Sequence, residues 1–98
     1  MEREHDARIT WSDAHLQRGL VARTEWIAPA WFVGDPPDAD GWSLVCRFEV
    51  APAEQGSPSA ARIRLWRPHA PHERLRPGAV LRLFEDVTLQ LATVEVLD

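Results

Sequence analysis

Apolar and polar residues alternate along most of this chain with a period of two. In the segment WSLVCRFEV (42–50), every even-numbered position carries an apolar side chain. In segments 7–11, 61–65 and 79–84, every odd-numbered position is apolar instead, although Val80 and Phe84 are apolar as well. Successive side chains of a β-strand point to opposite faces, so each segment is predicted to be a strand with one buried face. Segment 89–97 is also rich in β-forming residues, although its alternation is less regular.

Turn-forming residues separate these segments. GDPPDADG (34–41) and APAEQGSP (51–58) concentrate Pro, Gly and Asp, which favour turns. Segment 85–88 is short enough to close a hairpin, and segment 12–26 is expected to be an excursion or loop rather than a helix. The prolines of RPHAPHERLRPG (67–78) predict a stiff connection between two strands.

Five or six short strands separated by turns are typical of an antiparallel sandwich or barrel. The 98 residues suffice for one core that buries roughly 65% of the surface of the unfolded chain. We therefore expect an all-β fold, a six-stranded antiparallel Greek-key-like β-barrel. It would form a single domain over residues 1–98, with residues 1–5 as a frayed N-terminus.

Composition removes several kinds of chemistry. The chain has no lysine, so Schiff-base and P-loop-lysine mechanisms are excluded. It also has no tyrosine, so tyrosine chemistry is excluded as well. A single cysteine excludes an internal disulfide. The charged start MEREHDAR is unlike a signal peptide, and no apolar run approaches the roughly 20 residues of a membrane span. We expect a cytoplasmic protein without membrane association.

The net charge of −4 is unevenly distributed. Residues 1–61 carry 5 Arg against 10 acidic residues, and residues 83–98 carry 4 acidic residues and no base. Between them, residues 62–82 carry 6 Arg against Glu73 alone. A basic centre between acidic segments favours internal ion pairing at least as much as an anionic partner.

The order of the short motifs resembles the C-terminal β-barrel, domain III, of elongation factor Tu and the small stand-alone bacterial proteins that share it. In that family a first strand leads through a Glu-Gly-Gly-Arg loop to a Gly-Tyr-Arg-Pro-Gln-Phe strand. Here ARITW (7–11) leads through LQRG (16–19) to WIAPAWF (26–32), and RLWRP, RPGAVLRLFED and LATVEVL follow in the family's order.

The resemblance covers residues 6–97 and implies a barrel fold and a link to RNA or translation. Several positions depart from the family pattern. Ile27, Ala28 and Ala30 replace the polar residues around the family's proline, Asp86 stands at an expected glycine, and Thr93 replaces a later glycine. The resemblance therefore implies a fold more strongly than a function.

Residues suited to metal binding or catalysis occur, but not in patterns typical of a site. His69 and His72 lie between prolines without a third ligand nearby, so we expect loop histidines and no metal or cofactor. Cys46 falls at a buried position of its strand, which favours a small core residue over a nucleophile. Ser12, Asp13 and His15 have the residue types of a triad, but triads are assembled in space rather than by neighbouring positions. We predict no enzymatic activity and no catalytic residues.

Arginine and tryptophan give the strongest functional signal. Trp11 and Trp42 fall at buried positions, whereas Trp66 is predicted to point outward. Arginine beside an exposed tryptophan is typical of protein interfaces and of nucleic-acid surfaces. The alternative is a solvated arginine face paired with the chain's own acids. The candidate surface comprises Arg62, Arg64, Trp66, Arg67, Arg74, Arg76 and Arg82.

The sequence therefore predicts a non-catalytic interaction module that binds a protein partner through an Arg/Trp surface. The alternative is an RNA-binding or translation-associated barrel, as the resemblance implies. The net negative charge favours the protein-binding module over the RNA-binding barrel.

Overall fold

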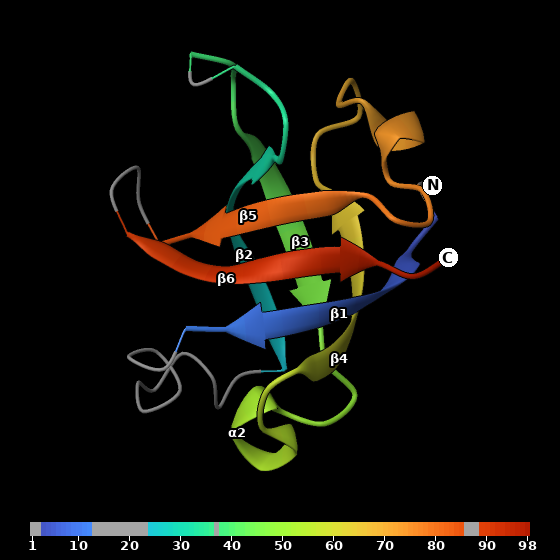
Figure 1. Ribbon diagram of the computed structural model, residues 1–98. Helices are drawn as coiled ribbons and strands as arrows, with labels where there is room; N and C mark the ends of the chain where they lie inside the picture. The colour runs from blue at the N-terminus through green and yellow to red at the C-terminus, as the bar shows by residue number, and fades with distance from the viewer. Residues whose placement is uncertain (1–2, 13–23, 37, 86–88) are drawn as a thin grey trace.

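The computed structural model describes residues 3–12, 24–36, 38–85 and 89–98, and there the chain forms a closed antiparallel β-barrel (Figure 1). The short helix α2 (Pro52–Gln55) and the 3-10 helix η2 (His72–Arg74) lie in the connections. The strands are β1 (His5–Trp11), β2 (Glu25–Phe32), β3 (Trp42–Arg47), β4 (Ser59–Leu65), β5 (Val80–Phe84) and β6 (Gln90–Val96).

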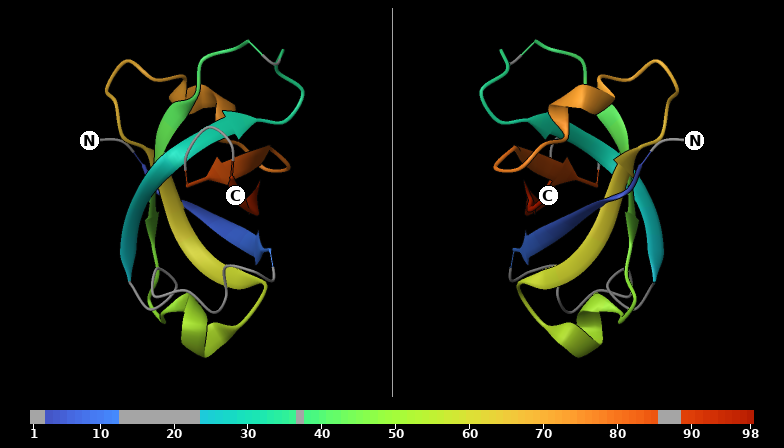
Figure 2. Two further views of the ribbon diagram at one scale, coloured as in Figure 1. Left: turned by 90° about the vertical axis from the view of Figure 1, so that its left-hand side faces the viewer. Right: turned by 90° about the vertical axis from the view of Figure 1, so that its right-hand side faces the viewer.

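The strand order around the barrel is β1-β4-β3-β2-β5-β6, with β6 returning to β1. Strands β2, β3 and β4 form a meander, β1 lies beside β4, and β5 lies beside β2, which is Greek-key connectivity. Figure 1 shows β5, β6 and β1 crossing in front of β2, β3 and β4, and Figure 2 shows the closed wall from both sides. The predicted fold class, a six-stranded antiparallel barrel, is confirmed.

The inward positions of the strands fill the barrel, as the period-two pattern predicts. Leu44 and Cys46 of β3, Ile63 of β4, and Leu81 and Leu83 of β5 are fully buried. At one end of the barrel, the Trp11 indole N–H donates a 2.9 Å hydrogen bond to the Ser59 hydroxyl, which satisfies two buried polar groups. The core residues of β3, β4 and β5 therefore follow from the sequence pattern.

Residues 66–79, which connect β4 to β5, close one end of the barrel. Ala70 and Leu75 from this segment are buried in the core. The Arg74 guanidinium lies 4.0 Å from the centre of the Phe32 ring and donates hydrogen bonds of 3.0 and 2.7 Å to the Asp35 carboxylate. The segment expected to be a stiff connection is thus also a lid that the core holds in place.

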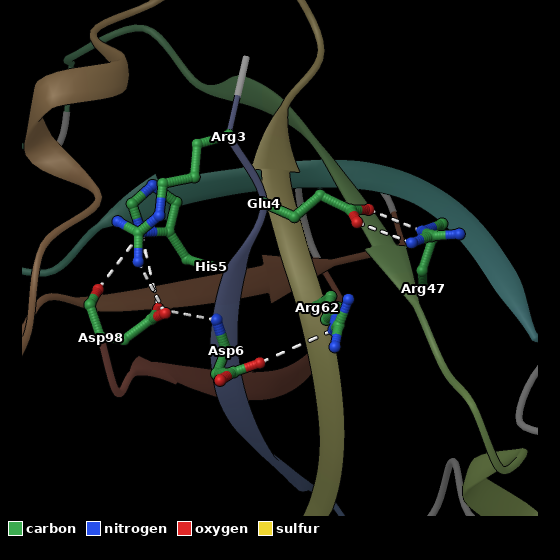
Figure 3. Close-up of polar contacts among 7 residues, drawn as sticks. All are labelled: Arg3, Glu4, His5, Asp6, Arg47, Arg62 and Asp98. Atoms are coloured by element: carbon green, nitrogen blue, oxygen red, sulfur yellow. Dashed lines mark hydrogen bonds and ion pairs between the residues drawn. The ribbon is translucent and has the colours of Figure 1, made fainter. Parts of the chain in front are cut away.

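Two boundaries differ from those expected. Strand β3 ends at Arg47, and Val50, predicted to point inward, is 45% exposed because α2 begins at Pro52. Residues 3–5, expected to fray, are instead tied down, since His5 is buried in β1 and Arg3 donates to the Asp98 carboxylate at 2.7 Å (Figure 3).

Two expectations lie largely outside the described residues. The excursion predicted for 12–26 falls mostly on 13–23, and the hairpin turn predicted for 85–88 falls mostly on 86–88. His15 and Asp13 belong to the first of these segments.

Among the helices of the described residues, none combines the length and the apolar character needed to cross a membrane.

Candidate functional site

The outer side of the β2–β3–β4 meander carries an unusually apolar surface. Ala28, Ala30 and Phe32 of β2 point into the core, so the residues between them point outward. Every outward residue from position 27 to 31 is apolar. Together with Val45 of β3 and Trp66 after β4, they form what we call the apolar face: Ile27, Pro29, Trp31, Val45 and Trp66. The polar Ser43 of β3 stands between Pro29 and Trp66.

Strand register places these side chains next to one another. Val45 of β3 stands directly opposite Ile27 of β2 on one side and Arg64 of β4 on the other. Residues paired in this way have side chains within contact distance on the same face of a sheet. Val45 is only 3% exposed although it points outward, because its neighbours cover it, whereas Ile27 is 47% exposed.

Trp31 is fixed in position on this face. Its indole N–H donates a 3.0 Å hydrogen bond to the carbonyl of Ala39, and its ring meets the Phe84 ring edge-on at 5.1 Å. The ring also lies against Gly41, where an added Cβ would come within 2.6 Å of it. Glycine at position 41 is therefore what allows the Trp31 ring to lie against the backbone just before β3.

Trp66 extends the apolar face beyond the end of β4. It is 50% exposed, and its backbone N–H donates to the Ser43 carbonyl at 2.9 Å, which continues the pairing of β4 with β3. The Arg67 guanidinium lies 5.2 Å from the centre of the Trp66 ring. A cation over an exposed tryptophan is a geometry suited to binding a partner that brings carboxylates or aromatic rings.

The predicted candidate residues do not gather on one surface. Strands β4 and β5 lie on opposite sides of the barrel, so Arg82 of β5 is remote from Arg62 and Arg64 of β4. Arg82 instead stands opposite Trp31, at the other margin of the apolar face. Arg76 lies in the lid segment and is exposed.

Ion pairing divides the arginines into two groups. Arg62 lies 3.8 Å from the Asp6 carboxylate, and Arg74 is held by Asp35 and Phe32, so these two predicted candidates have partners within the barrel. Arg3, Arg8 and Arg47 are also ion-paired. Within the described part of the chain, the arginines without an ion-pair partner are Arg64, Arg67, Arg76 and Arg82.

A paired polar network lies at the end of β3, where Arg47 follows Val45 on the outward side of the strand; Figure 3 shows its contacts. Arg47 donates two 2.6 Å hydrogen bonds to the Glu4 carboxylate. These bonds, with smaller contributions from the charges of Arg62 and Arg64, hold the pKa of Glu4 below its usual value, although desolvation opposes the shift. The same contacts raise the pKa of Arg47. This network satisfies its own charges and offers little to a partner.

Two surface depressions adjoin these residues. The larger, about 520 Å³, is lined mostly by charged residues of both signs that include Asp6, Arg47 and Arg62. The smaller, about 350 Å³, lies at the end of the apolar face near Arg67. It is lined by Asp40, Gly41, Trp42, Ser43, Arg67 and His69.

The residues considered for metal binding or catalysis are placed as follows. His69 is exposed and meets the Trp42 ring at 6.2 Å, and the His72 ring contacts the Pro68 carbonyl at 3.1 Å. Burial raises the pKa of the Cys46 thiol to about 12, which keeps it protonated. Trp42, expected in the core, is only half-buried and packs against the core from its margin. No group of three metal-binding side chains occurs among the residues the structure describes.

Sequence reasoning identified Trp66, Arg64 and Arg67 but missed β2. In the structure Ile27, Pro29 and Trp31 alternate with the inward residues Ala28 and Ala30. A segment that is apolar at every position from 26 to 32 shows no alternation, so the pattern does not reveal which side is outward. Only the placement of Ala28 and Ala30 in the core does so.

Likeness to known proteins gives no second source of information about this surface. No protein-family model, curated protein or solved structure matches the chain. Its function is therefore inferred from its own residues and their geometry.

Proposed function

We propose that this protein is a non-catalytic interaction module of the cytoplasm that binds a protein partner through Trp66, Arg64 and Arg67. The observation that carries the proposal is the half-exposed Trp66 ring with Arg67 over it. Trp and Arg are the residues most enriched at the energetic centres of protein interfaces. Arg64 and Arg67 have no ion-pair partner among the described residues, so their guanidinium groups are available to carboxylates of a partner.

The proposal is tested by affinity capture with variants. Immobilised wild-type protein is incubated with extract of the source cells, and the recovered proteins are quantified by mass spectrometry. A partner that uses this surface is recovered with the wild type but is lost with Trp66→Ala and with Arg64→Glu. Arg76→Glu is the matched control, because Arg76 is also exposed and without an ion-pair partner among the described residues. Unchanged recovery with both surface variants would contradict the proposal.

An RNA-binding or translation-associated role is the alternative, and the stacking of Arg67 on Trp66 favours it, since bases stack on such platforms. Phosphate binding, however, needs several free cations, and five described arginines are already paired with the chain's own acids. A gel-shift with transfer RNA at low salt separates the two roles. A shift that weakens steeply with added salt would favour RNA, and no shift at tens of micromolar protein would exclude it.

A further inference from the structure

The apolar face is larger than the surface on which the proposed function rests. Trp66 and Arg67 lie at one end of it, and the outward side chains of β2 continue it across the meander. An exposed apolar patch with polar residues around it commonly marks an interaction site in a soluble protein. The described strands close into a barrel, so we expect a partner on this side to bind chiefly through side chains.

Arginines are the charged residues that flank this face on its β4 and β5 sides, whereas Glu25 lies at the start of β2 and Asp40 lines the depression beside Arg67. Arg64 stands beside Val45 on the β4 side, Arg67 lies over Trp66, and Arg82 stands opposite Trp31 on the β5 side. All three lack an ion-pair partner in the described residues, whereas arginines elsewhere on the strands are paired. A ligand with carboxylates on either side of its apolar residues would complement both margins at once.

We infer that the apolar face docks an acidic peptide segment of another protein, in which apolar side chains lie between Asp or Glu residues. This inference rests on the proposed function and extends it from Trp66 to β2. The apolar side chains of the segment pack on Ile27, Pro29 and Trp31, and its carboxylates bind Arg64 and Arg67 at one margin and Arg82 at the other.

The fixed position of Trp31 favours this inference. Its hydrogen bond to Ala39 and its contact with Gly41 hold the ring in place before any partner arrives. A side chain that is already ordered loses little entropy on binding, which is the general advantage of preorganised surfaces.

A second copy of the chain is a poorer occupant. A two-fold contact through this face would bring the face of one molecule against the same face of the other. Arg64 and Arg67 would then approach unpaired cations rather than carboxylates, which opposes association.

The test is a peptide selection that makes no assumption about sequence. A random dodecapeptide phage library is selected on the immobilised wild-type protein, after depletion on Ile27→Thr/Trp66→Ala. Enriched peptides are synthesised, and their affinities are measured by fluorescence anisotropy. We expect peptides in which Asp or Glu residues flank apolar or aromatic residues.

Single variants locate the binding surface. Ile27→Thr keeps a β-branched residue in the strand but removes apolar contact area, and it should weaken binding about fivefold. Arg64→Glu should weaken binding about tenfold or more, because it places a carboxylate against the carboxylates of the peptide. The matched controls are Val50→Thr, which removes a similarly exposed apolar residue elsewhere, and Arg76→Glu, and both should change affinity less than twofold.

The outcomes separate this inference from the proposed function. If Trp66→Ala and Arg64→Glu lose the peptides but Ile27→Thr binds normally, the proposed function stands and docking on β2 is wrong. If the selected peptides are basic or uncharged, the acidic partner is wrong. If no peptide is enriched, or if none of the variants weakens binding, both the inference and the protein-binding surface fail. A dimer in analytical ultracentrifugation that Ile27→Thr abolishes would assign the face to a second copy and overturn the acidic segment.

Discussion

The outer surfaces of the two halves of the barrel differ in kind, although the inner surfaces are alike. On β1 and β6, which lie side by side, the outward residues are all polar: Asp6, Arg8, Thr10, Thr93 and Glu95. Arg8 pairs with Glu95 across these strands, and Thr10 stands opposite Thr93. On the β2–β3–β4 meander, polar residues such as Ser43 and Arg64 also point outward, but they share the surface with Ile27, Pro29, Trp31, Val45 and Trp66.

This difference indicates where selection has acted on more than folding. A strand needs one apolar face to build the core, and polar residues on the other face keep the surface soluble. β1 and β6 follow that rule. The apolar face does not follow this rule, because Ile27 and Trp66 are apolar and yet no other part of the described chain covers them. Residues that break a folding rule at no evident gain in stability are the expected places of function.

Among the substitutions that test this comparison, the largest loss of stability should come from a substitution at Gly41. Gly41→Ala places a Cβ against the Trp31 ring, and it should destabilise the protein by about 1–3 kcal/mol, as overpacking does. Gly41 has no positive φ, so the alanine backbone itself is tolerated. The free energy of unfolding is measured by urea denaturation. In the Trp31→Ala background the same change should cost much less, and an equal cost would show that the ring contact is not the cause.

A smaller effect is expected from the ion pair on the polar side. Arg8→Ala removes the partner of Glu95, and an exposed pair of this kind contributes at most about 1 kcal/mol. Urea denaturation at low and high salt measures the loss, which should shrink as salt screens the pair in the wild type. A salt-independent loss would indicate lost packing of the arginine stem instead.

Acid should weaken the protein through two carboxylates. Arg47 lowers the pKa of Glu4, and Arg74 lowers the pKa of Asp35, chiefly through hydrogen bonds. A pKa that is lower in the folded state gives stability that is present above the unfolded value and lost as pH falls through the folded value. The unfolding temperature should therefore decrease as pH falls below about 4.5.

The same contacts can be removed separately. Glu4→Gln/Asp35→Asn should lower the unfolding temperature at pH 7 by a few degrees and should flatten its decline in acid. Differential scanning calorimetry between pH 7 and pH 2.5 measures both. If the double variant declines as steeply as the wild type, other carboxylates determine the acid limit.

The smallest effect on stability, within about 0.5 kcal/mol, is expected from Ile27→Thr, because the side chain is half-exposed on the outer surface. Its effect should instead be on the surface itself. Binding of a hydrophobic dye to the folded protein should decrease with Ile27→Thr and increase with Thr93→Val on the polar side. Dye fluorescence that does not distinguish the two variants would mean that the two faces do not differ as proposed.

The candidate surface could be predicted only in part. Trp66 and Arg64 were identified because they alternate with the inward residues Ile63 and Leu65. Arg82 is not next to Arg64, because β4 and β5, although consecutive in sequence, are not neighbouring strands; it stands instead beside Trp31, at the opposite margin of the apolar face. The pairing partners of Arg62 and Arg74, Asp6 and Asp35, are far away in sequence and belong to other strands or loops.

The sequence by itself determined the all-β class, the inward residues of β1, β3, β4 and β5, and the outward direction of Trp66. These follow from alternation along one strand, which is a local property of the chain. The tertiary structure alone decided which strands are neighbours, which arginines are paired, that residues 66–79 form a lid, and that the outward residues of β2 join Trp66 and Val45 in one face. These depend on contacts between residues distant in sequence, whose pairing the alternation of a single strand does not encode.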